Sequence, residues 1–325
     1  MKSQFIFQLL LPAVLVATGG GEAYSQAWPA KPVRMVVPFA PGGAVDVTGR
    51  IIAQGLAGRL GQQVLVENRG GAGGNIGVES VAKSPADGYT IVMATAGQIS
   101  INPHMYAKLA FDPVKDLVAV SQAGQAINAL CVHPSLPAKS VKEFIAFANA
   151  RPNKLNFASG GIGASDHIAT ELFMSMTGVK LVHVPYKGGA PAMVDLIGGN
   201  VDLGFSTVAT AIGPIKAGRL RALGVTAAQR FELLPDVPTI AEAGVPGYES
   251  VAWYGLFAPA GTPPEVIRRL NAETVAVLQV PDVRRRLTEA GVLPTSSSPE
   301  AFAGYVATET ARWGKLIRAN GIKAE

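Results

Sequence analysis

The sequence predicts an α/β protein in two lobes, and three observations support this prediction. Short apolar, β-branched runs alternate with helical patterns, which indicates βαβ units and a mostly parallel, doubly wound sheet. The alternation falls into two sets, each too small to account for the whole chain. The 325 residues are 48% hydrophobic and 16% charged, so the chain can bury one large or two ordinary cores and is not disordered.

The first set begins with the apolar run Val33-Arg34-Met35-Val36-Val37, which ends at Pro38 and leads through Gly42-Gly43 into a helix. Apolar residues then recur at helical spacing, and two further β-branched runs follow. We expect strands over 33–37, 64–66 and 90–94, and helices over 47–60 and 76–82.

The second set begins after Asp116. Ser140 and Glu143 have the spacing of a capping box that opens a helix. We expect strands over 117–121, 129–133, 154–158, 181–185, 201–205 and 220–225, and helices over 142–149, 168–176 and 192–197.

A long loop with several prolines follows, and then two helices. The string Thr262-Pro263-Pro264-Glu265 is expected to cap the first of them. The second begins at Pro299 and places Phe302, Val306, Trp313 and Ile317 on one side.

Two extended stretches, near 122–129 and 249–258, are the segments least needed within either α/β set, so we expect them to cross between the lobes. We therefore expect one lobe of 28–125 plus 253–325 and a second of 126–252, with both ends of the mature chain in the first. Two crossings of this kind would let the lobes close about a few hinge residues.

Residues 1–27 are expected to be a signal peptide. Lys2 precedes the apolar stretch 5–17, and Ser25-Gln26-Ala27 places small residues three and one before a cut after Ala27. About 13 apolar residues, broken by Pro12, fall short of the roughly 20 that a membrane-spanning helix needs. The mature protein is therefore expected in the periplasm.

Charge and cysteine content narrow the function classes. The net charge is +5, but Lys and Arg are scattered, and we interpret the densest cluster, Arg284–Arg286, as a solvated helix face. We therefore expect no nucleic-acid partner, although a positive field suits a small anion. Cys131 is the only cysteine, which excludes an intrachain disulfide, a cysteine-cluster metal site and a lipid-modified mature N-terminus.

Four glycine-rich turns occupy strand-to-helix positions: 41–43, 70–75, 159–163 and 187–189. Backbone N–H groups at a helix N-terminus can hold a carboxylate without a cationic side chain. For any one such turn, the freedom of glycine to make tight turns is the favoured explanation. Similar strings around Phe39 and Tyr186, one in each lobe, favour a ligand held between the lobes.

No Arg or Lys lies inside the turns at 41–43 and 160–163. We therefore expect backbone N–H groups and hydroxyls to hold the anion, with Lys187 at most accessory. A Cβ added at Gly43 or Gly163 should then weaken binding more than removal of the Lys187 charge. Phe39 and Tyr186 could flank the ligand, although core packing explains either ring alone.

Catalytic and cofactor motifs are missing from the sequence. Ser165-Asp166-His167 has the residue types of a hydrolase triad, but neighbours on one helical turn point in different directions. Residues 71–77 miss the dinucleotide-binding spacing by one position, and the four histidines lack metal-ligand spacing. We expect no catalysis, cofactor or metal; His167 is expected to fix its turn by a hydrogen bond, and His133 to end a strand.

Several strings, in order along the mature chain, resemble the Bug family, the periplasmic solute-binding proteins of tripartite tricarboxylate transporters. They are Trp28-Pro29-Ala30-Lys31-Pro32, Val37 to Gly43 with Asp46 and Arg50, Val66-Glu67-Asn68-Arg69, Gly73-Gly74-Asn75-Ile76-Gly77, Asp87-Gly88-Tyr89-Thr90, Ile101-Asn102-Pro103, Val184 to Gly188, Leu234 to Thr239 and Phe257 to Pro263. Together these motifs are highly specific.

The resemblance implies a Venus-flytrap fold, type II-like, with two crossover strands, no catalysis, and a di-, tri- or aromatic carboxylate in the cleft. It also implies membrane permease subunits as partners, and we expect a monomer. The residues expected to bind the ligand are Phe39, Ala40, Pro41, Gly42, Gly43, Asp46, Thr95, Ser159, Gly161, Gly163, Ala164, Ser165, His167, Tyr186, Lys187, Gly188 and Thr207.

The chain departs from the family pattern in two places. Ala164 stands where relatives have Ser, so Ser165 or backbone N–H groups would have to substitute for the lost hydroxyl. Ser206-Thr207 follows Phe205 where relatives often have Asp-Asn, which favours a plain dicarboxylate or aromatic carboxylate over an amino acid, because a buried cation needs a countercharge. A ligand-sensing module for a receptor and a cleft enzyme remain as alternatives.

Overall fold

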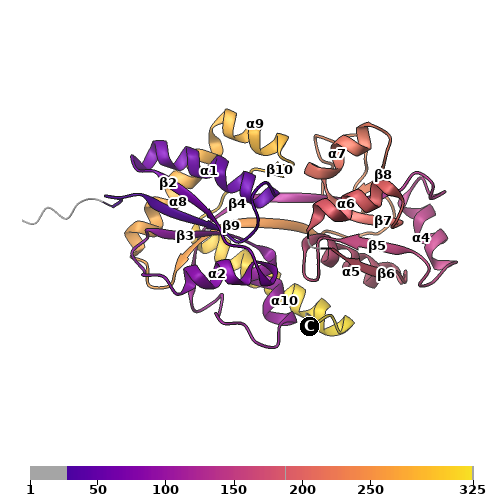
Figure 1. Cartoon of the computed structure of the whole chain (residues 1–325), viewed down its shortest axis with the longest axis horizontal. Helices are drawn as coiled ribbons and strands as arrows, with labels where there is room; N and C mark the ends of the chain where they lie inside the picture. The colour runs from indigo at the N-terminus through magenta and orange to yellow at the C-terminus, as the bar shows by residue number, and fades with distance from the viewer. Residues whose placement is uncertain (1–27, 187, 324–325) are drawn as a thin grey trace, which may run out of the picture.

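The computed structural model describes residues 28–186 and 188–323, and these form two lobes joined by two long strands (Figure 1). The expected signal peptide, 1–27, lies outside the described residues. The first strands and the C-terminal helices build one lobe, and the middle of the chain builds the other.

The first lobe has the strand order β2-β1-β3-β9-β4. Its strands are β1 (Val33–Val37), β2 (Val64–Asn68), β3 (Thr90–Thr95), β9 (Val251–Pro259), β10 (Val292–Leu293) and the first part of β4 (Leu117–Val132). Its helices are α1 (Ala44–Leu60), α2 (Asn75–Ala82), α3 (Asn102–Met105), α8 (Pro264–Gln279), α9 (Pro281–Glu289) and α10 (Pro299–Asn320), with the short turns η1 (Ala72–Gly74) and η2 (Gly97–Ile101).

The second lobe repeats this arrangement with the order β6-β5-β7-β4, and β8 pairs with the other edge of β4. Its strands are β5 (Asn156–Ser159), β6 (Val182–Pro185), β7 (Leu203–Thr207), β8 (Arg221–Val225) and the end of β4. Its helices are α4 (Val141–Asn149), α5 (Ser165–Thr177), α6 (Gly189–Gly198) and α7 (Val208–Lys216).

The sheet is only partly parallel. β1 pairs in parallel with β2 and β3, and β5 pairs in parallel with β6 and β7. The crossing strands β4 and β9 pair antiparallel with each other and with β7 and β3. The expectation of a mostly parallel sheet therefore holds within each βαβ set and fails where the chain changes lobe.

The shared topology corrects one inference from the sequence. The turn at Phe39 follows β1, the strand between β2 and β3, whereas the turn at Tyr186 follows β6, an edge strand. The counterpart of the Phe39 turn is the turn after Ser159, which follows β5, the strand between β6 and β7. The similar strings therefore occupy positions that are not equivalent.

The strands predicted over 117–121 and 129–133 form one continuous strand, β4. It pairs with β9 from Leu117 to Ile127 and with β7 from Asn128 to Val132, so its neighbour changes between Ile127 and Asn128. Its register with β9 is irregular between Ala119 and Ser121 and between Gln122 and Gly124, as at β-bulges.

Thr226 ties the two crossing segments together. Its hydroxyl accepts the Asn128 N–H at 3.0 Å, and its own N–H donates to the Asn128 carbonyl at 2.9 Å. The Thr226 carbonyl accepts the N–H of Ser250, which precedes β9, at 2.9 Å. One fully buried residue therefore fixes the spacing of both crossings.

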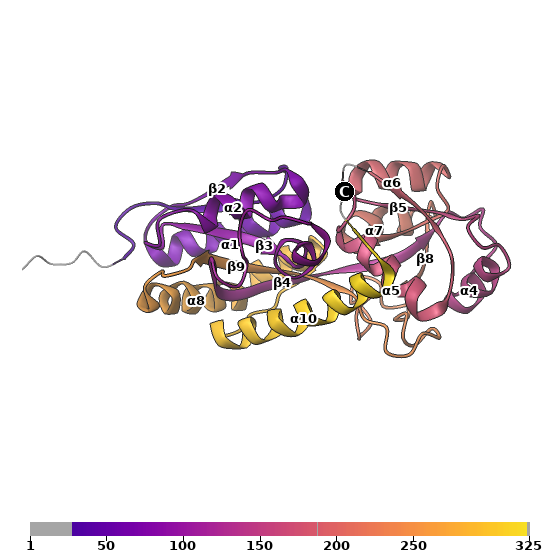
Figure 2. The ribbon, with the colours of Figure 1, turned by 90° about the horizontal axis from the view of Figure 1, so that it is seen from below.

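Helix α10 lies beneath the crossing strands, and its C-terminal end reaches α5 of the other lobe (Figure 2). Ile317 of α10 and Ile168 of α5 belong to one apolar cluster, which also contains Met105 and Trp253. The lobes are thus in apolar contact on this face.

Two local predictions need correction. Helix α7 was not expected, because Gly213 and Pro214 lie inside it and are typical helix breakers. Thr262 does not cap α8: its hydroxyl donates to the Pro259 carbonyl at 2.7 Å, and Pro263 is the N-cap. By contrast, Ser140 does cap α4, and its hydroxyl accepts the Glu143 N–H.

Candidate functional site

The loops that follow the parallel strands lie where the two lobes meet, at the carboxyl ends of β1, β2 and β3 and of β5, β6 and β7. In open α/β sheets, ligands bind at these strand ends. Helices α1, α2, α5, α6 and α7 begin in these loops, and none of their N-cap side chains makes a capping hydrogen bond.

The helices that begin outside these loops have different residues at their N-termini. Ser140 caps α4 and Ser298 caps α10, and α8 and α9 have proline in the first turn, where no N–H is needed. Uncapped N–H groups thus concentrate between the lobes, where they can receive an anionic group.

The turn after β1 is held by Asp46, which is 3% exposed. The Gly42 N–H donates to Asp46 at 2.9 Å, Arg50 donates at 3.0 Å and the Asn68 amide at 2.8 Å. Burial alone would raise the pKa of Asp46, but these donors hold that pKa below its usual value. Asp46 therefore shapes the turn, and Ala40 to Gly43 are exposed.

Phe39 and Gly43 lie at the two ends of this turn. Phe39 packs against the apolar core of the first lobe. Gly43 has φ −77°, a conformation open to any residue, and a Cβ there would meet nothing nearer than the Ala40 carbonyl at 3.9 Å. The expectation that Gly43 requires glycine was wrong; Gly42, with φ +85°, is the residue of this turn that does.

Gln98 organises the remaining loops of the first lobe, and sequence reasoning missed it. Its carbonyl oxygen accepts the Thr95 N–H and hydroxyl, both at 2.9 Å, and its amide donates to the Gly73 carbonyl at 2.6 Å. The loops after β2 and β3 are thereby tied together. Thr95, an expected binding residue, is buried and already bonded in this arrangement.

Asn75 and Asn102 form a second pair that the sequence did not single out. The Asn102 amide donates to Asn75 Oδ1 at 2.7 Å, and both side chains are buried. Within the described part of the chain, Asn75 Nδ2 has no hydrogen-bond partner. In the sequence, Asn102 stands out only as part of the motif Ile101-Asn102-Pro103, which belongs to the family pattern.

In the second lobe, two histidines hold the turn after β5 by hydrogen bonds. The Gly163 N–H donates to His167 Nδ1 at 3.1 Å, as expected for His167. Ser159 Oγ lies 2.6 Å from His183 Nε2, and the two imidazole rings stack at 4.2 Å. Burial, and then the neighbouring His167, lower the pKa of His183 to about 4, so this ring is neutral at pH 7.

The other predicted residues of the second lobe are placed as follows. Ala164 is the N-cap of α5 and Ser165 its first residue; the Ala164 N–H donates to the Gly161 carbonyl. Gly188 is the N-cap of α6 and Thr207 that of α7. The Tyr186 hydroxyl donates to Asp195 at 2.6 Å, so its polar end is already engaged within α6. Lys187 lies outside the described residues.

The two lobes touch at Gly163. A Cβ on Gly163 would lie 3.1 Å from Asn102 Oδ1 and 3.4 Å from Met105 Sδ, both of the first lobe. A second contact joins Gly291 to the first turn of α7, where an added Cβ would be 2.5 Å from the Ala209 nitrogen. The turn after β5 therefore lies against the start of α3 in the first lobe.

A small hollow opens between the N-termini of α5, α6 and α7. It is lined by Ala158, Asp166, Gly189, Ala192, Ser206, Thr207 and Thr210. Asp166 was considered in the sequence only as part of an apparent triad, yet it is the acidic group of this hollow.

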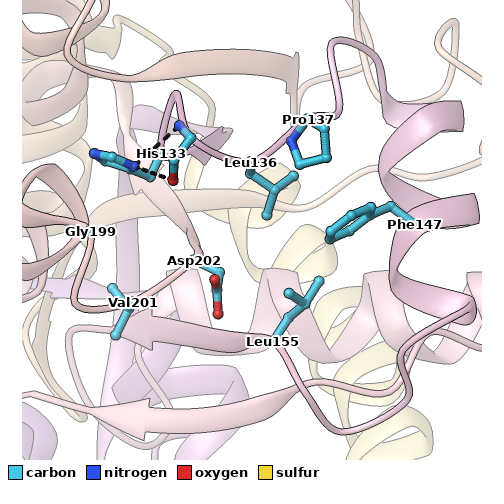
Figure 3. A pocket seen from close by; sticks show the side chains of 9 residues that line it. His133, Leu136, Pro137, Phe147, Leu155, Gly199, Val201 and Asp202 are labelled. Atoms are coloured by element: carbon cyan, nitrogen blue, oxygen red, sulfur yellow. Dashed lines mark hydrogen bonds between the residues drawn. The ribbon is translucent and has the colours of Figure 1, made fainter.

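A different pocket, of about 160 Å³, lies at the amino ends of β5 and β7, away from the other lobe (Figure 3). Leu136, Phe147, Leu155 and Val201 form its apolar part, and His133 and Asp202 its polar part. None of the residues predicted to bind the ligand lines it. His133 directly follows β4, as expected for a strand end.

Within residues 28–186 and 188–323, no group of three or more His, Cys, Asp or Glu side chains could hold a metal ion. In the same part of the chain, no helix is long and apolar enough to cross a bilayer.

The chain is similar to known proteins over nearly its whole length. Residues 48–322 match the family model "Tripartite tricarboxylate transporter family receptor". Protein BugT of Bordetella pertussis is 37% identical over 318 residues, 97% of this chain and 98% of BugT. A UPF0065 protein encoded in the tcbD-tcbE intergenic region of Pseudomonas sp. is 42% identical, over 90% of this chain and 87% of its own length.

Solved structures show the same fold. Rpa4515 of R. palustris with adipate has a TM-score of 0.84 and 40% identity, covering 91% of this chain and 99% of that one. MatC of Rhodopseudomonas palustris with bound malate has a TM-score of 0.80 and 34% identity, covering 89% and 100%. The periplasmic binding protein BugD has a TM-score of 0.81 and 34% identity, covering 92% and 100%.

Proposed function

The chain belongs to the tripartite tricarboxylate transporter receptors, the TctC or Bug family of periplasmic solute-binding proteins, and we propose that it captures a small organic carboxylate between its lobes. The family consists of transport receptors and not of enzymes. The captured compound would then pass to the membrane permease subunits of a tripartite transporter.

The observation that best supports this proposal is the set of uncapped helix N-termini between the lobes. Helices α1 and α2 of the first lobe leave backbone N–H groups and the positive ends of their dipoles available to a carboxylate. Relatives that carry adipate and malate make a carboxylate the first compound class to try. The ligand end in the first lobe would meet the exposed turn from Ala40 to Gly43.

The proposal includes export and closure. We place the signal-peptide cut after Ala27 and the lobes at 28–125 plus 253–325 and 126–252, with the hinge at the two crossings tied by Thr226. Intact mass of the protein from a periplasmic extract should correspond to a chain beginning at Trp28. A species that still contains residues 5–17 would show a retained anchor instead.

The experiment that tests the function is a calorimetric titration with a set of small carboxylates, including adipate and malate, followed by mass analysis of the recovered compound. We expect at least one to bind in a one-to-one complex and to be recovered unchanged. Chemical conversion of the bound compound, or no binding by any of them, would contradict the proposal.

A further inference from the structure

The far end of a ligand would meet the second lobe at the hollow between α5, α6 and α7, so the side chains that line this hollow set which group it accepts. Its lining has one charged side chain among the described residues, Asp166, and three hydroxyls, those of Ser206, Thr207 and Thr210. Its volume of about 40 Å³ has room for a water-sized polar group.

The Asp166 carboxylate already occupies the backbone donors at this place. The Gly160 N–H donates to Asp166 Oδ2 at 2.7 Å, and the His167 N–H donates to Oδ1 at 2.8 Å. A Cβ built on Gly160 would be 3.4 Å from Asp166 Oδ2 and 3.2 Å from the Gly189 nitrogen, so the start of α6 is also near. The chain's own carboxylate thus takes up two backbone N–H groups at the N-terminus of α5 and in the turn before it.

A second ionised carboxylate in the hollow would face Asp166 without these donors. Two like charges in a recessed site repel strongly, because the local dielectric is lower than that of water. A group with hydrogen to donate finds free lone pairs on Asp166. Ser206 and Thr207 offer hydroxyl oxygens beside it, and Thr210 already donates to the Thr207 carbonyl at 3.0 Å.

Burial raises the pKa of Asp166 to about 6, against the backbone N–H donors that lower it. Asp166 is therefore largely ionised above neutral pH and acts there as an acceptor. The sequence disfavoured an ammonium group because the acid that relatives often have after Phe205 is missing. Asp166 of α5 supplies an acid in the hollow, so that reason no longer applies.

We propose that the hollow receives a hydrogen-bond-donating group of the ligand, a hydroxyl or an ammonium, and discriminates against a second ionised carboxylate. The inference rests on the proposed function, since it concerns the far end of a ligand whose carboxylate is held elsewhere between the lobes. Asp166 is the specificity-determining residue in this scheme.

The test compares three probes of equal chain length that differ only at the far end: 6-aminohexanoate, 6-hydroxyhexanoate and adipate. Calorimetry is run above neutral pH, where Asp166 is ionised. We expect the better of the two donor probes to bind at least about tenfold more tightly than adipate, the scale of one charge-assisted hydrogen bond. A smaller difference, or tighter binding of adipate, overturns the inference and leaves the proposed function intact.

The variant Asp166→Asn has nearly the same shape without the charge. It should reduce the preference for the donor probe over adipate by about tenfold or more. Asp236→Asn is the matched control, because it removes one exposed acidic charge from the same lobe outside the hollow. An unchanged preference in folded Asp166→Asn overturns the inference; if that variant does not fold, the ranking of the probes on the unaltered protein still decides it.

Failure of all three probes and of malate to bind would be a different result. It would contradict the proposed capture of carboxylates, and the inference would fall with it.

Discussion

Gly163 of the second lobe lies against Asn102 of the first, so close that a single added carbon would sit 3.1 Å from the Asn102 amide oxygen. Gly163 has φ +79°, and its N–H is held by His167. The contact joins the turn after β5 in the second lobe to the start of α3 in the first.

Gly163→Ala should weaken carboxylate binding. The methyl group would strain a left-handed backbone and push Asn102 away, so the lobes could not approach as they do here. We expect an affinity loss of about tenfold or more, measured by calorimetry.

Gly43→Ala is the matched control for that variant, since Gly43 has an ordinary φ and open space at Cβ. It should bind within about threefold of the unaltered protein, a difference below roughly 1 kcal/mol. If Gly163→Ala binds normally while Lys187→Ala abolishes binding, a cationic side chain holds the anion and the backbone account is wrong.

Gly291→Ala should hinder closure. Its Cβ would collide with the Ala209 backbone of α7 across the lobes, at 2.5 Å from the nitrogen. At ligand saturation, we expect small-angle scattering to give a larger radius of gyration for this variant than for the unaltered protein.

Gly61→Ala separates closure from backbone strain. Gly61 has φ +70°, close to the +73° of Gly291, and it also follows a helix of the first lobe, but no atom lies within 4 Å of an added Cβ. Gly61→Ala should lose stability, about 1 kcal/mol, and close normally. Equal scattering from both variants would show that the Gly291 contact does not limit closure.

Thr226→Val should loosen the hinge. The variant keeps the shape and removes the hydroxyl that accepts the Asn128 N–H. We expect faster amide hydrogen exchange at Asn128 and Ser250, and a stability loss of about 1 kcal/mol.

Thr274→Val is the comparison for the hinge variant, because Thr274 is also fully buried but bonds only the Leu270 carbonyl of its own helix. It should leave exchange at Asn128 and Ser250 unchanged. If Thr226→Val also leaves it unchanged, the two crossings are not fixed by this residue.

His183 gives a prediction for acid stability. Its pKa is lowered to about 4 in the folded protein, so the unfolded chain takes up the proton first as pH falls. The contribution of neutral His183 to stability is full above the unfolded pKa, near 6.5, and is lost as pH falls toward 4. The loss amounts to at most about 3 kcal/mol.

The measurement is urea unfolding of the unaltered protein and of His183→Gln at pH 7 and near pH 4.5. The difference in unfolding free energy between the two proteins should shrink at the lower pH, because only the unaltered protein has the histidine to titrate. The raised pKa of Asp166 shifts stability in the opposite direction over the same pH range. Both proteins contain Asp166, so its contribution cancels when they are compared. A pH-independent difference would mean that folding does not lower the pKa of His183.

The sequence predicted the elements with clear periodicity and left out those that depend on tertiary contacts. The runs at Val33 and Thr90 are mostly apolar, as is typical of strands in a sheet covered on both faces, and they were located within one residue. Helix α7 was missed because packing stabilises it despite Gly213 and Pro214. The continuity of β4 depends on two partners, β9 and β7, that lie far away in the sequence.

The candidate site shows the same limit. Glycine turns before helices can be identified by type, so the segments at 41–43 and 159–163 were found. Which glycine takes a positive φ is set by local hydrogen bonds, such as that from Gly42 to Asp46, and Gly43 was chosen wrongly. Gln98 and Asn102 act through partners that only the fold brings near, and Asp166 belongs to a hollow built by three helices.

We propose that one carboxylate ligand touches both lobes at once. The most direct measurement is hydrogen–deuterium exchange with and without saturating ligand, followed on peptides covering 39–46 and 159–167. We expect simultaneous protection of both segments, with residues 133–137 and 199–202 around the pocket of Figure 3 unaffected. Protection confined to one lobe, or centred on that pocket, would contradict it.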